Sequence, residues 1–592
     1  MKKHCYYFIQ YFLSHSVLFL FPLFSNLYIK VKADTFIPPQ IFVHDFQPLD
    51  NAKRLPSSPY ISGDSFRSIA QFVIDETRNP IDPDLIKDGD ILFVKPELFE
   101  YFFTVIHPRI SHKYILISHN SDLSSPGTYR SFLNDNKIIA WFAVNTDISN
   151  HPKLIPIPIG IANAYCPKIG DCRLLDQLRS HLPSEKKHLL YVNFLTNTNP
   201  ERKILEDSFA KKIFCYNAQR KSWPDYLIDM GQSKFVLCPH GNGLDCHRTW
   251  EALLMGSIPI VKTSTLDPLY KNLPILIIQN WSEITEELLN KKYAEITSNS
   301  YNLERLFAPY WIDQIKKLQS TFRTILAHQK FLGVDFDQSM ARAYTYQKEY
   351  AKIDPTWQQV KYLYNKNSIN ELEIAPNPRI PKIIHQIWIG SPLPEKYKTL
   401  IATWKQFHPD WQHKLWTDKD IEEFGLINKD KYDAATNMGE KSDIAKWEII
   451  YRYGGLYVDT DFECLKAFDL FHHSFDFYTG IGDEKEFLLY AALFAAHPHH
   501  PILKKCVENL HYIKTNSTDA NEIIHKTGPY FFTRCAKECL NSLKDRSVFF
   551  PVTNFYPWPG RDRFDKSRAA IEKWFKPESF AVHHWHQSWM KH

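Results

Sequence analysis

Short apolar runs alternate with amphipathic stretches from about residue 36 to residue 325. The runs that read as buried strands are 90–94, 114–117, 138–142, 189–192, 235–237, 258–261 and 275–278. Helical patterns lie between several of them, for example at 246–255. Strands and helices in alternation predict parallel sheets with crossover helices. The region 36–335 is therefore predicted to form two doubly wound halves, at about 36–185 and 186–335.

A different pattern follows. Residues 301–364 have a mainly polar and helical pattern, and residues 365–381 contain Pro376, Pro378 and Pro381 with few large apolar side chains, as linkers do. A buried-strand pattern then starts at Lys382. We expect a helical segment and linker at 336–376, and a second α/β domain at 377–592.

The N-terminus has the composition of a targeting segment. Lys2 and Lys3 precede an uncharged stretch from Cys5 to Ile29, and small residues suitable for cleavage end at Ala33. This order is typical of a secretory signal peptide. The stretch also has the roughly 20 residues that a membrane anchor needs. Residues 1–33 are therefore predicted to be either, giving an exported or membrane-associated protein.

Composition excludes some functions. The net charge is +5 over 592 residues, and Lys and Arg are interleaved with Asp and Glu, so we expect no nucleic-acid partner. The ten Cys include no C-x-x-C pair, which gives no support to a zinc ribbon or finger. Aromatic residues make up 15% of the chain, a high share that suits both packed cores and sugar-binding sites.

The segment 442–461 carries the most specific chemistry. Its first part is helical to Tyr453, Gly454 and Gly455 end the helix, and a short apolar strand leads to Asp459 and Asp461. Alternate residues of an extended strand point to the same side. The two carboxylates would then suit Mg²⁺ or Mn²⁺ with positions left for phosphate oxygens.

A cation at this place would offset the charge that builds on a departing diphosphate. The same carboxylates would also suit a metal-dependent phosphohydrolase, although that class normally needs further carboxylate or His ligands around two metals. A third reading is a glycan-binding module without activity.

The order of motifs resembles glycosyltransferase family 32, which includes the Och1-like mannosyltransferases and is related to the clostridial glucosylating toxins. The matching parts are the strand 380–388, a Ser-Asp-x-x helix at 442, a Tyr-Gly-Gly-x-Tyr turn at 453–457, and Asp-x-Asp at 459–461. The resemblance covers about 377–592 and implies a GT-A-like α/β fold with a retaining transferase site.

The resemblance also implies roles for individual residues. Asp461 would ligate the metal, Asp459 would contact metal or ribose, and Asp443 would bind hydroxyls of the donor sugar. Tyr457 and Trp388 would line the nucleotide pocket. The family has Arg where this chain has Lys446, which keeps the charge but loses the planar fork that grips two oxygens.

The chain ends in a tail rich in His and Trp, which related enzymes place over the donor site. By resemblance His583, His584 or His586 would complete the metal shell, and we expect His584 and His586 to be the ligands. Trp589 would cap the nucleotide or its diphosphate. The turn at 527–529 matches an acceptor-side turn of the family.

A second motif, at 234–261, reads as strand, Gly-rich turn, helix and strand. Gly241 and Gly243 would let backbone N–H groups at the helix start bind a diphosphate, with Arg248 adding charge and Glu251 accepting from ribose hydroxyls. The string resembles exostosin-like transferases of the glycosyltransferase family 47 type, which implies a GT-B-like pair of Rossmann-type halves and, where active, an inverting site.

Together these features predict a glycosyltransferase that uses Mn²⁺ or Mg²⁺ and a UDP- or GDP-sugar, with a glycan, glycolipid or protein as acceptor. They leave open whether the N-terminal half is a second transferase or a non-catalytic glycan-binding domain.

Overall fold

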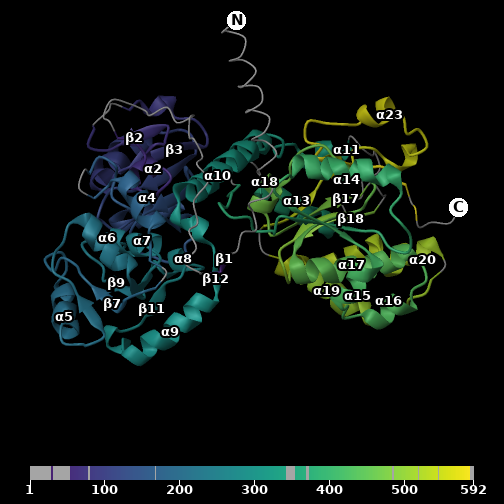
Figure 1. Ribbon diagram of the computed structural model, residues 1–592. Helices are drawn as coiled ribbons and strands as arrows, with labels where there is room; N and C mark the ends of the chain where they lie inside the picture. Colours follow the sequence, from purple (N-terminus) through teal and green to yellow (C-terminus); the bar gives the residue numbers. More distant parts are fainter. Residues whose placement is uncertain are drawn as a thin grey trace, which may run out of the picture. The chain divides into compact units, whose positions relative to one another are not determined.

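The computed structural model describes residues 29–30, 54–77, 81–166, 169–183, 185–341, 354–367, 372–482, 486–517, 519–543, 546–586 and 588. The chain divides into two compact units, Met1–Gln319 and Ser320–His592 (Figure 1). Both units are mixed α/β with parallel strand pairs, as predicted. The domain boundaries expected near residues 185, 335 and 376 stay predictions.

The predicted signal or anchor at 1–33 lies outside the described residues, apart from the two-residue strand β1 (Ile29–Lys30). Within the described part of the chain, no helix combines the length and apolar character needed to cross a bilayer.

The N-terminal unit contains two five-stranded sheets in which every neighbouring pair is parallel. The first has the order β2 (Phe72–Ile74), β3 (Asp90–Val94), β4 (Tyr114–Ser118), β5 (Ile138–Ala143), β6 (Leu154–Pro156). The second has the order β11 (Leu276–Ile278), β10 (Ile258–Lys262), β9 (Ser233–Leu237), β7 (His188–Val192), β8 (Cys215–Asn217). All seven predicted runs are strands. Three strands of these two sheets were not predicted, β2, β6 and β8, and each has three residues, too few to show a periodicity.

Each of these sheets has its own apolar core, because strands of a parallel sheet are covered on both faces. One core gathers side chains around Trp141, whose indole N–H donates to the Ser118 hydroxyl at 2.9 Å. The other gathers side chains from β7, β9, β10 and β11 around Phe235.

The C-terminal unit is built on one six-stranded sheet. Its order is β14 (Gln412–Trp416), β13 (Ile383–Ile387), β15 (Gly455–Val458), β18 (Leu489–Ala496), β17 (Phe477–Ile481), β19 (Ser547–Phe550). Strand β15 pairs in parallel with β13 and antiparallel with β18, so the sheet is mixed. Strand β15 is fully buried, which fits a position inside the sheet.

Two glycines join helix α17 (Met438–Tyr453) directly to β15. Gly454 and Gly455 have φ values of 65° and 103°, a region that residues with a side chain rarely adopt. A Cβ on Gly454 would lie 2.7 Å from Pro498, and one on Gly455 would lie 2.7 Å from the Ile383 carbonyl. After this tight connection, Tyr457 of β15 lies beside α17, with its ring centre 5.2 Å from Lys446 Nζ.

Buried histidines predict that the C-terminal unit loses stability in mild acid. His385 donates to the Gly454 carbonyl and accepts from the Trp416 indole, and His408 donates to Trp404 and accepts from the Phe468 N–H. A ring that accepts a hydrogen bond must be neutral at that nitrogen.

Burial lowers the pKa of His385 and of His408 from 6.5 to about 4. The unfolded chain therefore takes up protons first, and the stability that these rings contribute is complete above pH 6.5 and is lost as the pH falls toward 4. We expect the urea midpoint of the C-terminal unit, followed by Trp fluorescence, to fall between pH 7.5 and pH 5. An unchanged midpoint over this range would contradict the expectation.

Candidate active site

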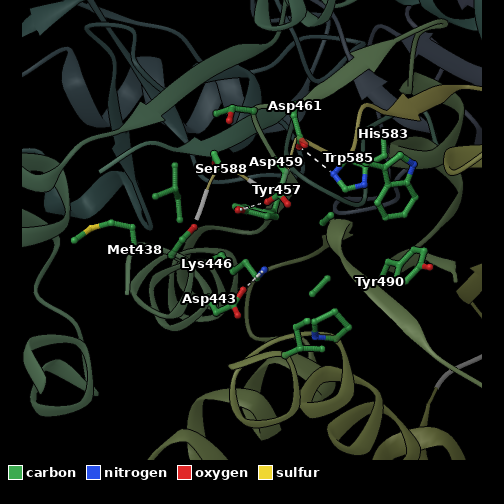
Figure 2. Close-up of a pocket in the computed structure, with 18 of the residues that line it drawn as sticks. Met438, Asp443, Lys446, Tyr457, Asp459, Asp461, Tyr490, His583, Trp585 and Ser588 are labelled. Carbon is green, nitrogen blue, oxygen red and sulfur yellow. Dashed lines mark hydrogen bonds and ion pairs between the residues drawn. The ribbon is translucent and has the colours of Figure 1, made fainter. Parts of the chain in front are cut away.

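The Asp459-Thr460-Asp461 segment is a turn, whereas the sequence suggested extended backbone. Strand β15 ends at Val458, and the Phe462 N–H donates to the Asp459 carbonyl at 3.2 Å, the i to i+3 bond of a β-turn. The chain turns here because β16 (Phe462–Cys464) leaves the main sheet to pair with β20 (Ala581–His583). The turn still brings the two carboxylates together (Figure 2).

The pairing of β16 with β20 adds a histidine to this turn. His583 lies opposite Phe462 in the register, and its Nε2 is 3.0 Å from Asp461 Oδ1. Within the described residues, one ligand atom from each of Asp459, Asp461 and His583 falls within 4.8 Å of the others. Two carboxylates and an imidazole form a donor set that suits a divalent ion of the Mn²⁺ kind.

The electrostatics show that this cluster needs positive charge. Burial raises the pKa of the Asp459 carboxyl to about 6; the Lys446 ammonium opposes the rise and the charge of Asp461 adds to it. Burial alone would also raise the pKa of Asp461, but His583 and the His586 N–H hold it well below its ordinary value. A bound cation would allow both carboxylates to stay ionised side by side.

The tail places the other predicted ligands differently. The His584 ring lies 3.1 Å from Glu463 Oε2, so it faces the carboxylate of β16. His586 donates its backbone N–H to Asp461 Oδ2 at 2.8 Å. Of the three tail histidines, the structure thus sets the ring of His583 beside Asp459 and Asp461. Trp589 lies outside the described residues.

Helix α17 presents a buried ion pair to the same cavity. Lys446 Nζ is 2.6 Å from Asp443 Oδ1, and the Lys446 side chain is only 5% exposed. The Thr527 hydroxyl lies 3.1 Å from Asp443 Oδ2. The Tyr457 hydroxyl donates to Asp459 Oδ1 at 2.7 Å, so a residue of β15 holds one carboxylate of the turn.

The cavity between these groups measures about 540 Å³, enough for a nucleotide-sugar. Trp388 lines it, with its ring 4.7 Å from that of Tyr397. Several lining residues were not singled out from the sequence, and they are Tyr397, Met438, Tyr490, Asn521, His525, Tyr530 and Trp585. They come from five separate segments, so only the fold reveals that they share one cavity.

The Gly-rich motif of the N-terminal unit forms the predicted strand, turn and helix. Helix α7 (His247–Leu254) follows β9 after the turn that contains Gly241 and Gly243. A Cβ on Gly241 would lie 3.1 Å from Arg202, and one on Gly243 would lie 2.6 Å from Asn145. Close packing therefore accounts for both glycines without any ligand.

The charged residues of this motif have protein partners. Arg248 donates to the Asn193 carbonyl at 3.1 Å, and its guanidinium lies 5.5 Å from the centre of the Phe194 ring. The Glu251 carboxylate accepts from the Trp223 indole at 2.9 Å and from the Tyr226 hydroxyl at 3.2 Å. The two partners hold the carboxylate in a fixed orientation on α7.

Comparison with known proteins agrees with both motifs. Residues 394–486 match the model described as a glycosyltransferase sugar-binding region containing a DXD motif, and residues 183–332 match the RXYLT1 C-terminal domain. The two resemblances drawn from the sequence, to a DXD-containing transferase and to an exostosin-like domain, are thereby confirmed.

Three yeast proteins are among the relatives of this chain. Inositol phosphoceramide mannosyltransferases 3 and 1 of Schizosaccharomyces pombe are 33% and 34% identical over 108 and 140 residues, which are 18% and 22% of this chain. The mannosyl phosphorylinositol ceramide synthase SUR1 of Saccharomyces cerevisiae is 30% identical over 175 residues, 27% of this chain. The chain spans between 30% and 43% of the length of these relatives.

A solved structure, the PaToxG glycosyltransferase, is 20% identical and aligns with 33% of this chain and 79% of its own. The TM-score of this alignment is 0.24.

The contact of Thr527 with Asp443 gives a test of how the site is held. In Thr527→Val one oxygen of the Asp443 carboxylate loses its donor in a largely buried place, which should cost about 1–3 kcal/mol. Thr527→Ser keeps the hydroxyl and should lose less. The measurement is the midpoint of thermal unfolding of both variants beside the wild type; equal midpoints for Val and Ser would show that the hydroxyl bond contributes nothing.

Proposed function

We propose that the C-terminal unit is a metal-dependent, retaining glycosyltransferase with a GT-A-like arrangement, which transfers mannose from a nucleotide-sugar to a glycolipid. One observation carries the proposal. The cluster of Asp459, Asp461 and His583 and the Asp443–Lys446 pair face one cavity, and all of these residues except His583 lie within the segment that matches the DXD model.

Different residues of the cavity would bind the diphosphate and the sugar of the donor. The carboxylates of Asp459 and Asp461, with the His583 ring, would hold Mn²⁺ or Mg²⁺, which would supply charge to offset a departing diphosphate. Asp443 is oriented by Lys446 and Thr527, so it presents fixed acceptor oxygens to hydroxyls of the donor sugar. Burial keeps this geometry in place before the donor binds.

Other lining residues suit the nucleotide and the acceptor. Trp388 and Tyr457 offer a stacking face and a hydroxyl beside the cluster. Tyr490, Trp585 and the stacked His525–Tyr530 pair, with ring centres 4.0 Å apart, supply flat apolar faces of the kind that pack against sugar rings. The mannosyltransferase names of the relatives favour a GDP-sugar donor and an inositol-containing glycolipid acceptor. An exported or anchored chain, as residues 1–33 predict, would meet such an acceptor at a membrane.

For the N-terminal unit we propose a GT-B-like domain in which α7 is the nucleotide side. Its two parallel sheets and the orientation of Glu251 favour a second transferase. The alternative is a glycan-binding domain without activity, which the packing role of Gly241 and Gly243 favours.

The test is Mn²⁺-dependent release of GDP from GDP-mannose by the purified full chain. We expect Asp461→Ala to lower the rate at least about 100-fold, because it removes a ligand of the metal ion that stabilises the leaving diphosphate. Asp433→Ala removes an exposed carboxylate on α16 (Lys429–Ala434) and is the matched control, which should keep the rate. UDP-sugars are screened beside GDP-mannose.

Glu251→Gln in the same assay reports on the N-terminal unit. Loss of a separate, metal-independent turnover would show a second active site, and an unchanged total rate would favour the glycan-binding alternative. Folded protein that releases nucleotide from no donor would contradict the transferase proposal.

A further inference from the structure

A short segment beside the cavity holds much of the protein's net charge. Residues 560–576, here called the arm, contain six Lys and Arg and three Asp and Glu, a net charge of +3, whereas the whole chain carries +5. The arm consists of the 3₁₀ turn η11 (Gly560–Asp562), a loop, and helix α23 (Arg568–Glu572) with the residues that follow it. Figure 1 shows α23 at the outer edge of the C-terminal unit, away from its sheet.

The arm carries an aromatic side chain with no cover. Phe564 is 83% exposed, whereas Trp558 before the arm and Phe580 after it are buried. The Arg563 guanidinium lies 4.5 Å from the centre of the Phe564 ring. An exposed Phe with a basic residue stacked on it combines an apolar group with a cation in one place, the combination found where proteins enter the headgroup region of a membrane.

Two basic residues beside Phe564 are held by backbone carbonyls. Within the described residues Arg563 and Lys566 form no ion pair; Arg563 donates to the Gly560 carbonyl and Lys566 to the His584 carbonyl. Of the acidic residues in the arm, Asp562 lies 4.0 Å from the Arg561 guanidinium, and Asp565 accepts from the Ser567 N–H. Arg568, in contrast, is paired with Glu463 and Glu572, so it adds little to the positive potential of the arm.

The arm is fixed to the wall of the cavity. The Trp585 indole donates to the Trp558 carbonyl at 2.9 Å, and a Cβ on Gly560 would lie 3.5 Å from the Trp585 ring. Ile571 of α23 packs in a small core with Trp558 and Val582. Trp585 also lines the cavity, so a partner that binds the arm lies near the cavity.

We propose that the arm docks the C-terminal unit onto the anionic surface of a lipid bilayer, with Phe564 entering the headgroup region and Arg563 and Lys566 facing lipid phosphates. A protein partner is less suited, because a stable interface covers about 800 Å² on each side around an apolar centre, and the arm offers one aromatic side chain among charges. Docking would bring the cavity to the glycolipid acceptor. This benefit rests on the proposed function, whereas binding to vesicles can be measured without it.

The experiment is hydrogen exchange of the full chain mixed with vesicles, read in peptides that span 560–576. Phosphatidylcholine vesicles with about one third phosphatidylinositol should slow exchange in the arm, and vesicles of phosphatidylcholine alone should not, because the attraction needs anionic lipid. Phe564→Ser should require a roughly tenfold higher vesicle concentration for the same protection, since it removes the apolar side chain that enters the bilayer. Tyr512→Ser, at a residue 82% exposed elsewhere in the unit, is the matched control and should keep the protection.

Three results would overturn the proposal: no slowing with anionic vesicles, equal slowing with both kinds of vesicle, or full protection in Phe564→Ser. Protection that rises with protein concentration in the absence of lipid would also overturn it, in favour of contact between copies of the chain. Release of GDP from GDP-mannose is measured on the same samples. A folded protein that turns over donor but ignores vesicles refutes the docking alone, and one that binds vesicles but turns over no donor refutes the transferase alone.

Discussion

Two neighbouring carboxylates, the buried Asp461 and the half-buried Asp459, are the constraint on which the C-terminal unit depends. Each would be costly to bury without positive charge nearby. The protein supplies that charge from three directions: the Lys446 ammonium from α17, the His583 ring from β20, and the His586 N–H from the tail. The arrangement leaves the carboxylates short of full compensation, since the pKa of Asp459 is still raised to about 6. A divalent cation would remove this deficit, and a nucleotide diphosphate would in turn need that cation.

The rest of the unit can be understood as the means of bringing these charges together. The paired glycines at 454 and 455 allow α17 to pass into β15 without a loop, and Asp443, Lys446 and Asp459 line the same cavity. The β-turn after β15 then sends the chain away from the main sheet as β16. Only because β16 leaves the sheet can it pair with β20 and carry His583 to Asp461.

Much of this was open to prediction from the sequence. Long apolar runs such as 114–117 and 138–142 became strands, because such runs are buried on both faces of a parallel sheet. The helix, double glycine and strand around Asp459 were also readable, since each part has a local signal. Extended backbone at Asp459 and Asp461 was expected but a turn is found, because the turn is imposed by the pairing of β16 with a strand 122 residues later, between His583 and Asp461. The contact of Thr527 with Asp443 and the exposure of Phe564 also depend on how segments far apart in the sequence pack together. The residues next to them in the sequence therefore do not predict these features.

The most direct test of the central claim is the position of Mn²⁺ in crystals of the full chain grown with Mn²⁺ and GDP. Anomalous scattering collected near the manganese edge locates the ion independently of its surroundings. We predict one strong peak between the carboxylates of Asp459 and Asp461 and the His583 ring, with diphosphate oxygens beside it. A well-ordered nucleotide in the cavity with no peak at these three residues, or a peak held by other residues, would contradict the claim that this cluster is the metal site.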